Sequence, residues 1–170
     1  ITITTLCKFK KEVFKENLKS CSDNKLNNEC YGTSISSKGD IFIGKFTKGK
    51  IGYGVQIAGR LDNLVKVGDF KNNSLNGFGK VYSPLQGSYE GELKNGRAEG
   101  YGVKKYTTGG SYEGYFKNNM YSGKGIFTSV DGDIAEGEFH KNNLKYGSIK
   151  FGHKNSLYGF VYEGAYTALG

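Results

Sequence analysis

The sequence predicts an all-β protein, an elongated single-layer antiparallel sheet of tandem β-hairpins. Composition gives the first indication: glycine supplies 27 of the 170 residues, and Tyr and Phe supply 13 and 11, against one proline. So many aromatic residues argue against a disordered tail. The second indication is that glycines recur at nearly constant intervals, each inside the same local pattern. A period of 20–50 residues is typical of stacked repeats.

Each repeat is anchored on a glycine inside a short segment in which large apolar residues alternate with charged ones, as in Tyr89-Glu90-Gly91-Glu92-Leu93. The equivalent anchors are Gly44, Gly68, Gly91, Gly114, Gly137 and Gly164, separated by 24, 23, 23, 23 and 27 residues. Glycine pairs spaced by one residue follow the first four anchors: Gly52/Gly54, Gly77/Gly79, Gly100/Gly102 and Gly123/Gly125. The fifth copy keeps only Gly147. This pattern predicts about five repeats and a partial one.

One repeat is predicted to be one hairpin. Residues 89–93 alternate with the period of a half-buried strand. Asn95-Gly96 follows as a turn, because Asn and Gly tolerate positive φ. The second strand is expected to start at the glycine pair and to continue through Val103. An isolated hairpin is marginally stable, so successive hairpins must pair edge to edge.

Stacked hairpins place equivalent residues side by side in two aromatic columns. One column is Phe46, Phe70, Leu93, Phe116, Phe139 and Tyr166. The other is Phe42, Tyr89, Tyr112 and Tyr162, interrupted by Lys66 and Ala135. Glycines between the columns would leave room for rings to lie across the backbone, or for a sharp twist.

The array is predicted to occupy residues 40–170, preceded by a degenerate repeat over 18–39. In that degenerate copy Cys21 replaces the anchor glycine and Cys30 the first glycine of the pair. Residues 1–17 precede the array, and we expect them to cap the first hairpin, because open arrays need protected ends. A degenerate strand pair or a membrane-surface segment is the alternative for residues 8–19. The strand edge at the far end is expected to be covered by a further segment, another chain or a second copy of this chain.

Residues 89–102 resemble the MORN repeat, whose pattern is approximately Tyr-x-Gly-x-(Trp/Phe)-x-Asn-Gly-x-x-x-Gly-x-Gly. The resemblance covers about residues 40–166, with a weaker copy from 18 to 39. The chain departs from the pattern in having no tryptophan, in Lys66 and Ala135, and in its fifth repeat. Arrays similar to this one occur in membrane-contact, cytoskeletal and division-ring proteins. They also accompany kinase and methyltransferase domains.

The resemblance implies a non-enzymatic scaffold that binds protein partners through a groove. We expect a helix or an extended peptide there, in a cytoplasmic protein at the cytoskeleton or the cytoplasmic face of a membrane. A homodimer, an end-to-end assembly and an accessory domain of a larger enzyme remain open. The candidate groove residues are Tyr53, Phe78, Tyr89, Tyr101 and Tyr112. Some of these rings must belong to the core, and the sequence does not distinguish them.

The formal charge is 24 − 16 = +8, which permits an anionic partner. Four turn lysines are candidate contacts with an anionic membrane surface: Lys71, Lys94, Lys117 and Lys141. A solvated row of turn residues is the plainer interpretation of them. Nucleic acid is not expected, because the aromatic residues alternate with glutamates rather than with basic residues.

No catalytic, cofactor or metal site is expected. The two histidines, His140 and His153, lie beside neither a cysteine nor a nucleophile motif. Asp131-Gly132-Asp133 lacks the ligand spacing of an EF-hand and is predicted to be a turn. Three cysteines without tight pairing favour a reducing compartment. For Cys21 and Cys30 we favour small buried side chains over a disulfide or a metal site, and we expect Cys7 to be a plain strand residue.

Overall fold

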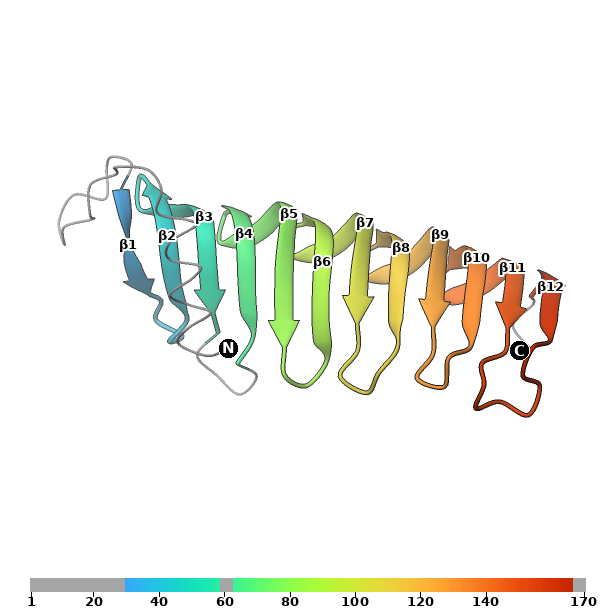
Figure 1. Ribbon diagram of the computed structural model, residues 1–170. Helices are drawn as coiled ribbons and strands as arrows, with labels where there is room; N and C mark the ends of the chain where they lie inside the picture. The colour runs from blue at the N-terminus through green and yellow to red at the C-terminus, as the bar shows by residue number, and fades with distance from the viewer. Residues whose placement is uncertain (1–29, 59–62, 167–170) are drawn as a thin grey trace.

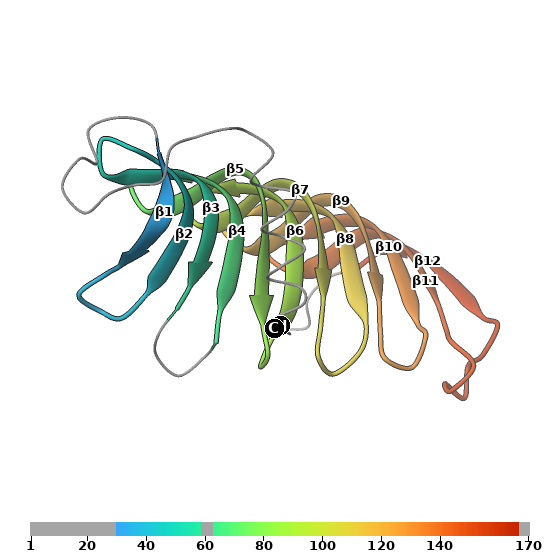
Figure 2. The same ribbon diagram turned by 60° about the vertical axis from the view of Figure 1, so that its left-hand side comes forward.

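The computed structural model describes residues 30–58 and 63–166, which form one antiparallel sheet of twelve strands. The strands pair strictly in chain order, so the sheet is a continuous meander. They are β1 Cys30–Ile35, β2 Ile41–Thr47, β3 Lys50–Ile57, β4 Val65–Lys71, β5 Ser74–Ser83, β6 Gly87–Lys94, β7 Arg97–Lys105, β8 Ser111–Lys117, β9 Met120–Thr128, β10 Ile134–His140, β11 Asn143–Lys150 and β12 Val161–Ala165. Figures 1 and 2 show them side by side along one long axis, with their ends at the tight hairpin turns bent back behind the sheet. The predicted fold class is confirmed.

Tight turns join the two strands of each repeat. In the β6–β7 turn Asn95 and Gly96 have φ of 51° and 75°, and Asn118 and Asn119 in the β8–β9 turn have 50° and 67°. Two consecutive positive φ values are the signature of a type I′ turn, which matches the twist of the flanking strands. Asn and Gly occupy these places because other residues adopt that conformation at a cost. The turns predicted at these positions are confirmed.

The second strand of each repeat starts earlier than the sequence predicted. β7 begins at Arg97, directly after the turn, and Leu93 already pairs with Ala98. The ladder then shifts register before Gly91 pairs with Gly102. Gly100 lies in this bulge with φ of 74°, which is why glycine is needed there. The carboxylate of Glu92 accepts a hydrogen bond from the Tyr101 N–H at 3.1 Å across the bulge.

A row of glycines crosses the whole sheet, with one glycine on each strand. In order from β1 to β12 the glycine row consists of Gly32, Gly44, Gly54, Gly68, Gly79, Gly91, Gly102, Gly114, Gly125, Gly137, Gly147 and Gly164. A Cβ added at Gly125 would lie 2.3 Å from the Tyr112 hydroxyl oxygen. Glycine is therefore required here because a tyrosine ring covers the backbone, as one of the two sequence interpretations proposed.

The core lies on the inner face of the sheet, inside the bend. Both predicted aromatic columns point to this face, together with a third set of residues after the turns. The buried members are Phe42, Phe46, Ile51, Phe70, Leu75, Tyr89, Leu93, Ala98, Tyr112, Phe116, Tyr121 and Phe139. Tyr112 stacks on Tyr121 at 3.6 Å and meets Phe116 and Phe139 edge-on at 5.1 and 5.2 Å. The opposite face, which we call the outer face, carries the residues that alternate with these.

Within the described residues, β1 pairs with β2 in the register that later strands use. Cys30 pairs with Phe46 in β2, just as Gly100 pairs with Phe116, and Gly32 pairs with Gly44 as Gly102 does with Gly114. The predicted cap at residues 1–17, the rest of the degenerate repeat up to residue 29 and the last residues, 167–170, lie outside the described residues. No helix in the described ranges is long and apolar enough to cross a membrane.

Candidate docking surfaces

The five candidate groove residues fall on two opposite faces. Tyr89 and Tyr112 belong to the inner face and are buried, Tyr112 completely. Their hydroxyl groups donate hydrogen bonds to the backbone carbonyls of Glu92 and Tyr115, at 2.7 and 3.1 Å. Their assignment to a partner-binding groove is therefore corrected: both rings are core residues that cover the glycine row.

Burial also raises the pKa values of these two phenols. It raises the pKa of Tyr89 to about 12, with a smaller contribution from the Glu92 carboxylate. The pKa of Tyr112 rises to about 12, again mainly through burial and then through Tyr101. A neutral, hydrogen-bonded phenol in this place has a structural role.

Tyr53, Phe78 and Tyr101 lie on the outer face and are exposed. The structure adds Tyr115 and Tyr146 to the same line, since Tyr115 pairs directly with Tyr101 and Tyr146 lies opposite Glu138. We call these five exposed rings the tyrosine row: Tyr53, Phe78, Tyr101, Tyr115 and Tyr146. Polar residues on the intervening strands, among them Asp69, Glu92, Lys124 and Glu138, lie between them.

Sequence reasoning missed Tyr115 and Tyr146 for an identifiable reason. Tyr115 directly follows an anchor glycine, where the other repeats carry Lys45, Asp69, Glu92 and Glu138. Tyr146 lies in the fifth repeat, whose glycine pair is incomplete. Alternation with the buried Phe116 was the available signal, because it places Tyr115 on the face opposite the core.

A shallow groove of about 630 Å³ lies over the glycine row between β7 and β11. One wall is formed by Tyr101, Tyr115 and Tyr146, and the other includes Glu113 and Glu136. Tyr101 and Tyr115 meet edge-on at 5.5 Å, and the Tyr101 hydroxyl donates to the Glu113 carboxylate at 2.7 Å. This hydrogen bond raises the pKa of Tyr101. The rings are thus held in place before any partner arrives.

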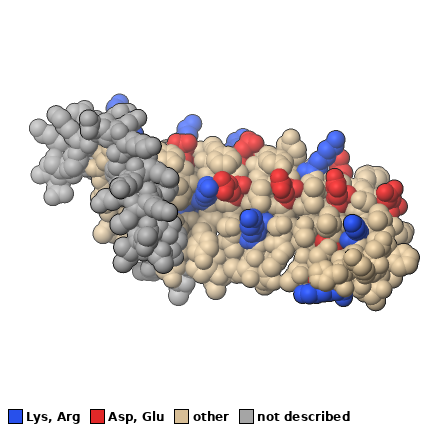
Figure 3. Space-filling view, viewed as in Figure 1, with Lys and Arg blue, Asp and Glu red and all other residues tan. Residues whose placement is uncertain are grey.

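Carboxylates form the second line of the outer face, on the other side of the glycine row. We call them the glutamate row: Glu90, Glu113, Glu136 and Glu163. Figure 3 shows acidic side chains running along the length of the molecule on the face turned to the viewer. Lys80 forms an ion pair with Glu90 at 2.9 Å. Lys80, Val103, Ile126 and Ser148 alternate with the glutamates on the intervening strands.

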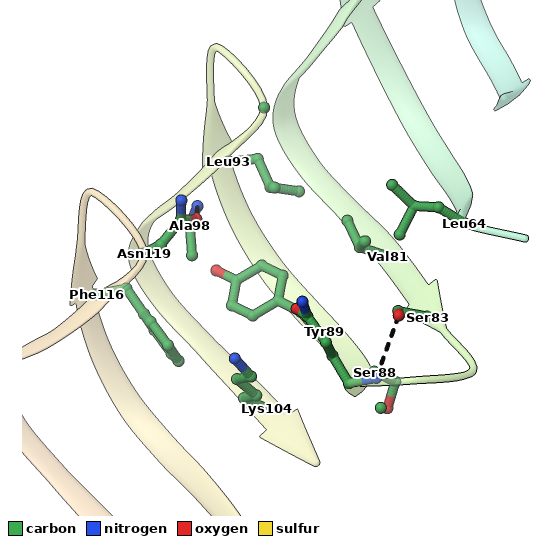
Figure 4. Close-up of a pocket in the computed structure, with 13 residues that line it drawn as sticks. Leu64, Val81, Ser83, Ser88, Tyr89, Leu93, Ala98, Lys104, Phe116 and Asn119 are labelled. Atoms are coloured by element: carbon green, nitrogen blue, oxygen red, sulfur yellow. Dashed lines mark hydrogen bonds between the residues drawn. The ribbon is translucent and has the colours of Figure 1, made fainter. Parts of the chain in front are cut away.

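The inner face also has open space beside its core. Two adjoining hollows, of about 270 and 560 Å³, share Lys104 and Asn119 in their walls. Figure 4 shows Tyr89 in the first hollow, with Leu93, Phe116 and Lys104 around it. The Lys104 ammonium lies 4.9 Å from the centre of the Tyr106 ring, a cation–π contact. The aromatic rings that line these hollows, Tyr89, Tyr106, Phe116, Tyr121 and Phe127, are buried or half-buried.

The four candidate turn lysines are all exposed at the hairpin-turn edge of the sheet. Lys71, Lys94 and Lys117 occupy equivalent places, each as the last residue of the first strand of its hairpin. The equivalent residue of the fifth repeat is His140. Lys141 instead lies inside its turn with φ of 48°. The row therefore continues through three repeats, the second to the fourth, and is offset in the fifth.

The remaining polar candidates from the sequence are the Asp131-Gly132-Asp133 segment and the two histidines. Asp133 lies in the turn between β9 and β10, in line with the turn interpretation, and accepts a hydrogen bond at 2.8 Å from the Gly152 N–H in the β11–β12 connection. No group of three or more metal-ligating side chains occurs within residues 30–58 and 63–166. His140 and His153 are exposed.

Cys30 is buried and disulfide-bonded, which corrects the interpretation of this residue as a plain small side chain. Cys7 and Cys21 lie outside the described residues, so the pairing of Cys21 with Cys30 stays one of the alternatives that the sequence left open.

Comparison with protein families bears out the repeat. The family model of the MORN repeat matches three consecutive stretches, residues 67–84, 89–111 and 112–134. The chain contains MORN repeats. These stretches correspond to the hairpins β4–β5, β6–β7 and β8–β9, the central part of the sheet. The repeats β2–β3 and β10–β11 continue the same ladder on either side of them. No curated protein matches the chain.

Proposed function

We propose that this protein is a non-enzymatic scaffold that binds a protein partner on its outer face, along the tyrosine row. One observation carries the proposal: five large rings in a single line are between 40% and 65% exposed. Exposed apolar side chains that gather in one place among polar residues mark interaction sites, and in this row Tyr101 and Tyr115 are direct neighbours. Tyrosine is also among the residues that contribute most to binding energy at interfaces.

The backbone beneath the row supports this role. Each strand from β2 to β11 is hydrogen-bonded on both sides, so the rings project from a continuous ladder. The Glu113 carboxylate and the Tyr115 ring further restrict Tyr101. A preorganised surface loses less conformational entropy on binding than a flexible one.

The repeat family also supports this role. MORN repeats are common in proteins that mediate protein or membrane interactions. We extend the proposal to complex assembly at the cytoskeleton or the cytoplasmic face of a membrane.

Site-specific photo-crosslinking tests the docking surface. A benzoyl-phenylalanine at position 115 faces the proposed partner, and one at position 106 faces the inner hollow. We expect position 115 to crosslink a defined protein in source lysate, and Tyr101→Ala to reduce that product. Crosslinking from position 106 alone would move the docking surface to the inner face and refute the proposal.

An anionic membrane surface is the second candidate partner, because cations gather on the hairpin-turn edge. Lys71, Lys94 and Lys117 line up there, and none forms an ion pair within the described residues. Each lysine near an anionic leaflet contributes about 1 kcal/mol. Phosphatidylserine vesicles should then bind the protein at low salt and release it as salt rises. Replacement of these three lysines by glutamate should abolish that binding; no binding of the unaltered protein would exclude this candidate.

A further inference from the structure

The outer face differs in charge from the rest of the chain. The chain has a net charge of +8. Next to the glycine row, however, the outer face carries seven carboxylates: Asp69, Glu90, Glu92, Glu113, Glu136, Glu138 and Glu163. The lysines in the same two lines are three: Lys45, Lys80 and Lys124. The docking surface is therefore acidic in a basic protein, and charge complementarity favours a cationic partner.

Not all of these carboxylates are equally available. Lys80 neutralises Glu90, and Glu92 accepts the hydrogen bond from the Tyr101 N–H. Glu136 and Glu163 have no hydrogen-bond or ion-pair partner within residues 30–58 and 63–166. Both are exposed. Glu113 accepts the Tyr101 hydroxyl through Oε1, which leaves its Oε2 for a cation. The available part of the glutamate row therefore runs from this second oxygen of Glu113 on β8 to Glu163 on β12, beside Tyr115 and Tyr146.

The glutamate row has a regular spacing. Its members lie on β6, β8, β10 and β12, and each of these strands is separated from the next by one intervening strand. Neighbouring strands are about 4.8 Å apart, so successive carboxylates repeat every ~9.6 Å along the sheet. A partner that lies along the glycine row and contacts each glutamate must present a cation at the same interval.

A polyproline II helix fits this interval more closely than an α-helix. It rises about 3.1 Å per residue with three residues per turn, so every third side chain repeats at ~9.3 Å on one side. An α-helix repeats one face every seven residues, at ~10.5 Å. Glu113 and Glu163 are separated by two such intervals, or ~19.2 Å. Over this distance the cations of a polyproline II helix fall about 0.6 Å short of the glutamates, whereas those of an α-helix overshoot them by about 1.8 Å.

The opposite wall of the groove also suits such a segment. Polyproline II peptides dock on aromatic-lined grooves, where proline rings pack on Tyr side chains. Their backbone carbonyls have no internal hydrogen bonds and need donors. Tyr115 and Tyr146 line this groove, and their hydroxyl groups have no hydrogen-bond partner in the described part of the chain. Lys124, which also lines the groove, pairs with Glu138 on the same side of the glycine row as the tyrosine row, away from the glutamate row.

We propose that the outer face binds a basic polyproline II segment that runs along the glycine row. Lys or Arg at every third residue meets Glu113, Glu136 and Glu163, and proline or other apolar residues pack on Tyr101, Tyr115 and Tyr146. The proposal rests on the outer face being the docking surface, as proposed above, and it names the chemical class of the partner.

Three synthetic peptides labelled with a fluorophore test this. The first repeats Arg-Pro-Pro five times; the second has the same composition with the arginines in one block; the third is an Ala-rich α-helix with Arg at every seventh residue. Fluorescence anisotropy at low salt gives their affinities for the full chain. We expect the Arg-Pro-Pro peptide to bind about tenfold more tightly than the block peptide and the helix. Equal affinities, tighter binding of the helix, or no binding would overturn the proposal.

Paired variants locate the contact. An exposed ion pair contributes at most about fivefold in affinity, so Glu136→Gln with Glu163→Gln should weaken binding of the Arg-Pro-Pro peptide about tenfold. Glu99→Gln with Asp131→Asn is the matched control, because it removes two carboxylates outside both rows and should change the affinity less than twofold. Equal losses in both pairs would indicate non-specific charge attraction and contradict the proposal.

The crosslinking experiment tests the docking surface and the class of the partner separately. A protein captured from position 115 that the Arg-Pro-Pro peptide displaces supports both proposals. Capture that the peptide does not displace retains the docking surface and overturns the partner class. The absence of any specific capture from position 115 would remove both.

Discussion

Replacing Gly125 by alanine should destabilise the protein through one identifiable clash. Gly125 has a backbone conformation open to L-residues, so the substitution introduces no φ strain. Its Cβ would lie 2.3 Å from the hydroxyl oxygen of Tyr112 and 2.5 Å from Cζ, at least an ångström closer than ordinary contact. The ring cannot shift easily, because it is fully buried, stacked on Tyr121 at 3.6 Å and flanked by Phe116.

The expected loss of stability follows from the two ways of relieving that clash: the core becomes overpacked, or the Tyr112 ring leaves its place. Overpacking a core costs about 1–3 kcal/mol, and removing a buried aromatic ring costs about 3–5 kcal/mol. We therefore expect a loss of about 3 kcal/mol. For a chain of this size this lowers Tm by roughly 6–12 °C.

Gly52→Ala is the matched control for Gly125→Ala. Gly52 also has a compatible backbone, and its Cβ would meet only the Lys45 carbonyl at 3.6 Å. This substitution should be neutral or stabilise by up to about 1 kcal/mol. Urea and thermal unfolding measure both variants. Equal stabilities of Gly125→Ala and Gly52→Ala would refute the reasoning that a ring occupies the space above the glycine row.

Three further predictions concern the inner face. Tyr89→Phe removes the hydroxyl that donates to the Glu92 carbonyl at 2.7 Å and should cost about 1 kcal/mol in urea unfolding, without changing peptide binding. Asn119→Ala should cost about 1–3 kcal/mol for two reasons: the side-chain oxygen accepts the N–H of buried Ala98 at 2.7 Å, and the φ of 67° suits Asn better than Ala. Asn119→Asp keeps the acceptor and tolerates this φ, so it should recover most of the loss. The pKa values of Tyr89 and Tyr112, about 12 against 10 when unfolded, mean that unfolding releases phenolic protons in alkali. Stability should therefore be fully present below pH 10 and fall between pH 10 and 12, as urea midpoints and absorbance at 295 nm would report.

The sequence predicted the fold well because the repeat period is marked by Asn and Gly, which are tied to positive φ and to close backbone contacts. Asn95-Gly96 and its equivalents specify turns, and the anchor glycines specify the row at which the strands pair. The bulge was not predicted, because Gly100 and Gly102 look alike in the sequence although one lies in a register shift and the other under a tyrosine ring. The start of the second strand was misplaced for the same reason.

The candidate surface was predicted only in part. Alternation separates the two faces of a strand, but it does not say which face is buried when both carry tyrosines. In β8 Tyr112 and Tyr115 are three residues apart and point to opposite faces. The distinction arises from the bend of the sheet, which encloses Tyr112 between neighbouring hairpins. The glutamate row likewise becomes a line only when the register of all the strands is known.

The same pair of tyrosines offers the most direct test of the division between an inner core and an outer docking surface. Tyr112→Ala and Tyr115→Ala should be compared in urea unfolding and in crosslinked capture of the partner. We predict that Tyr112→Ala loses about 3–5 kcal/mol of stability. Tyr115→Ala should remain within about 0.5 kcal/mol of the unaltered protein while capture falls severalfold. A large loss of stability in Tyr115→Ala, or undiminished capture by a stable Tyr115→Ala, would contradict the division.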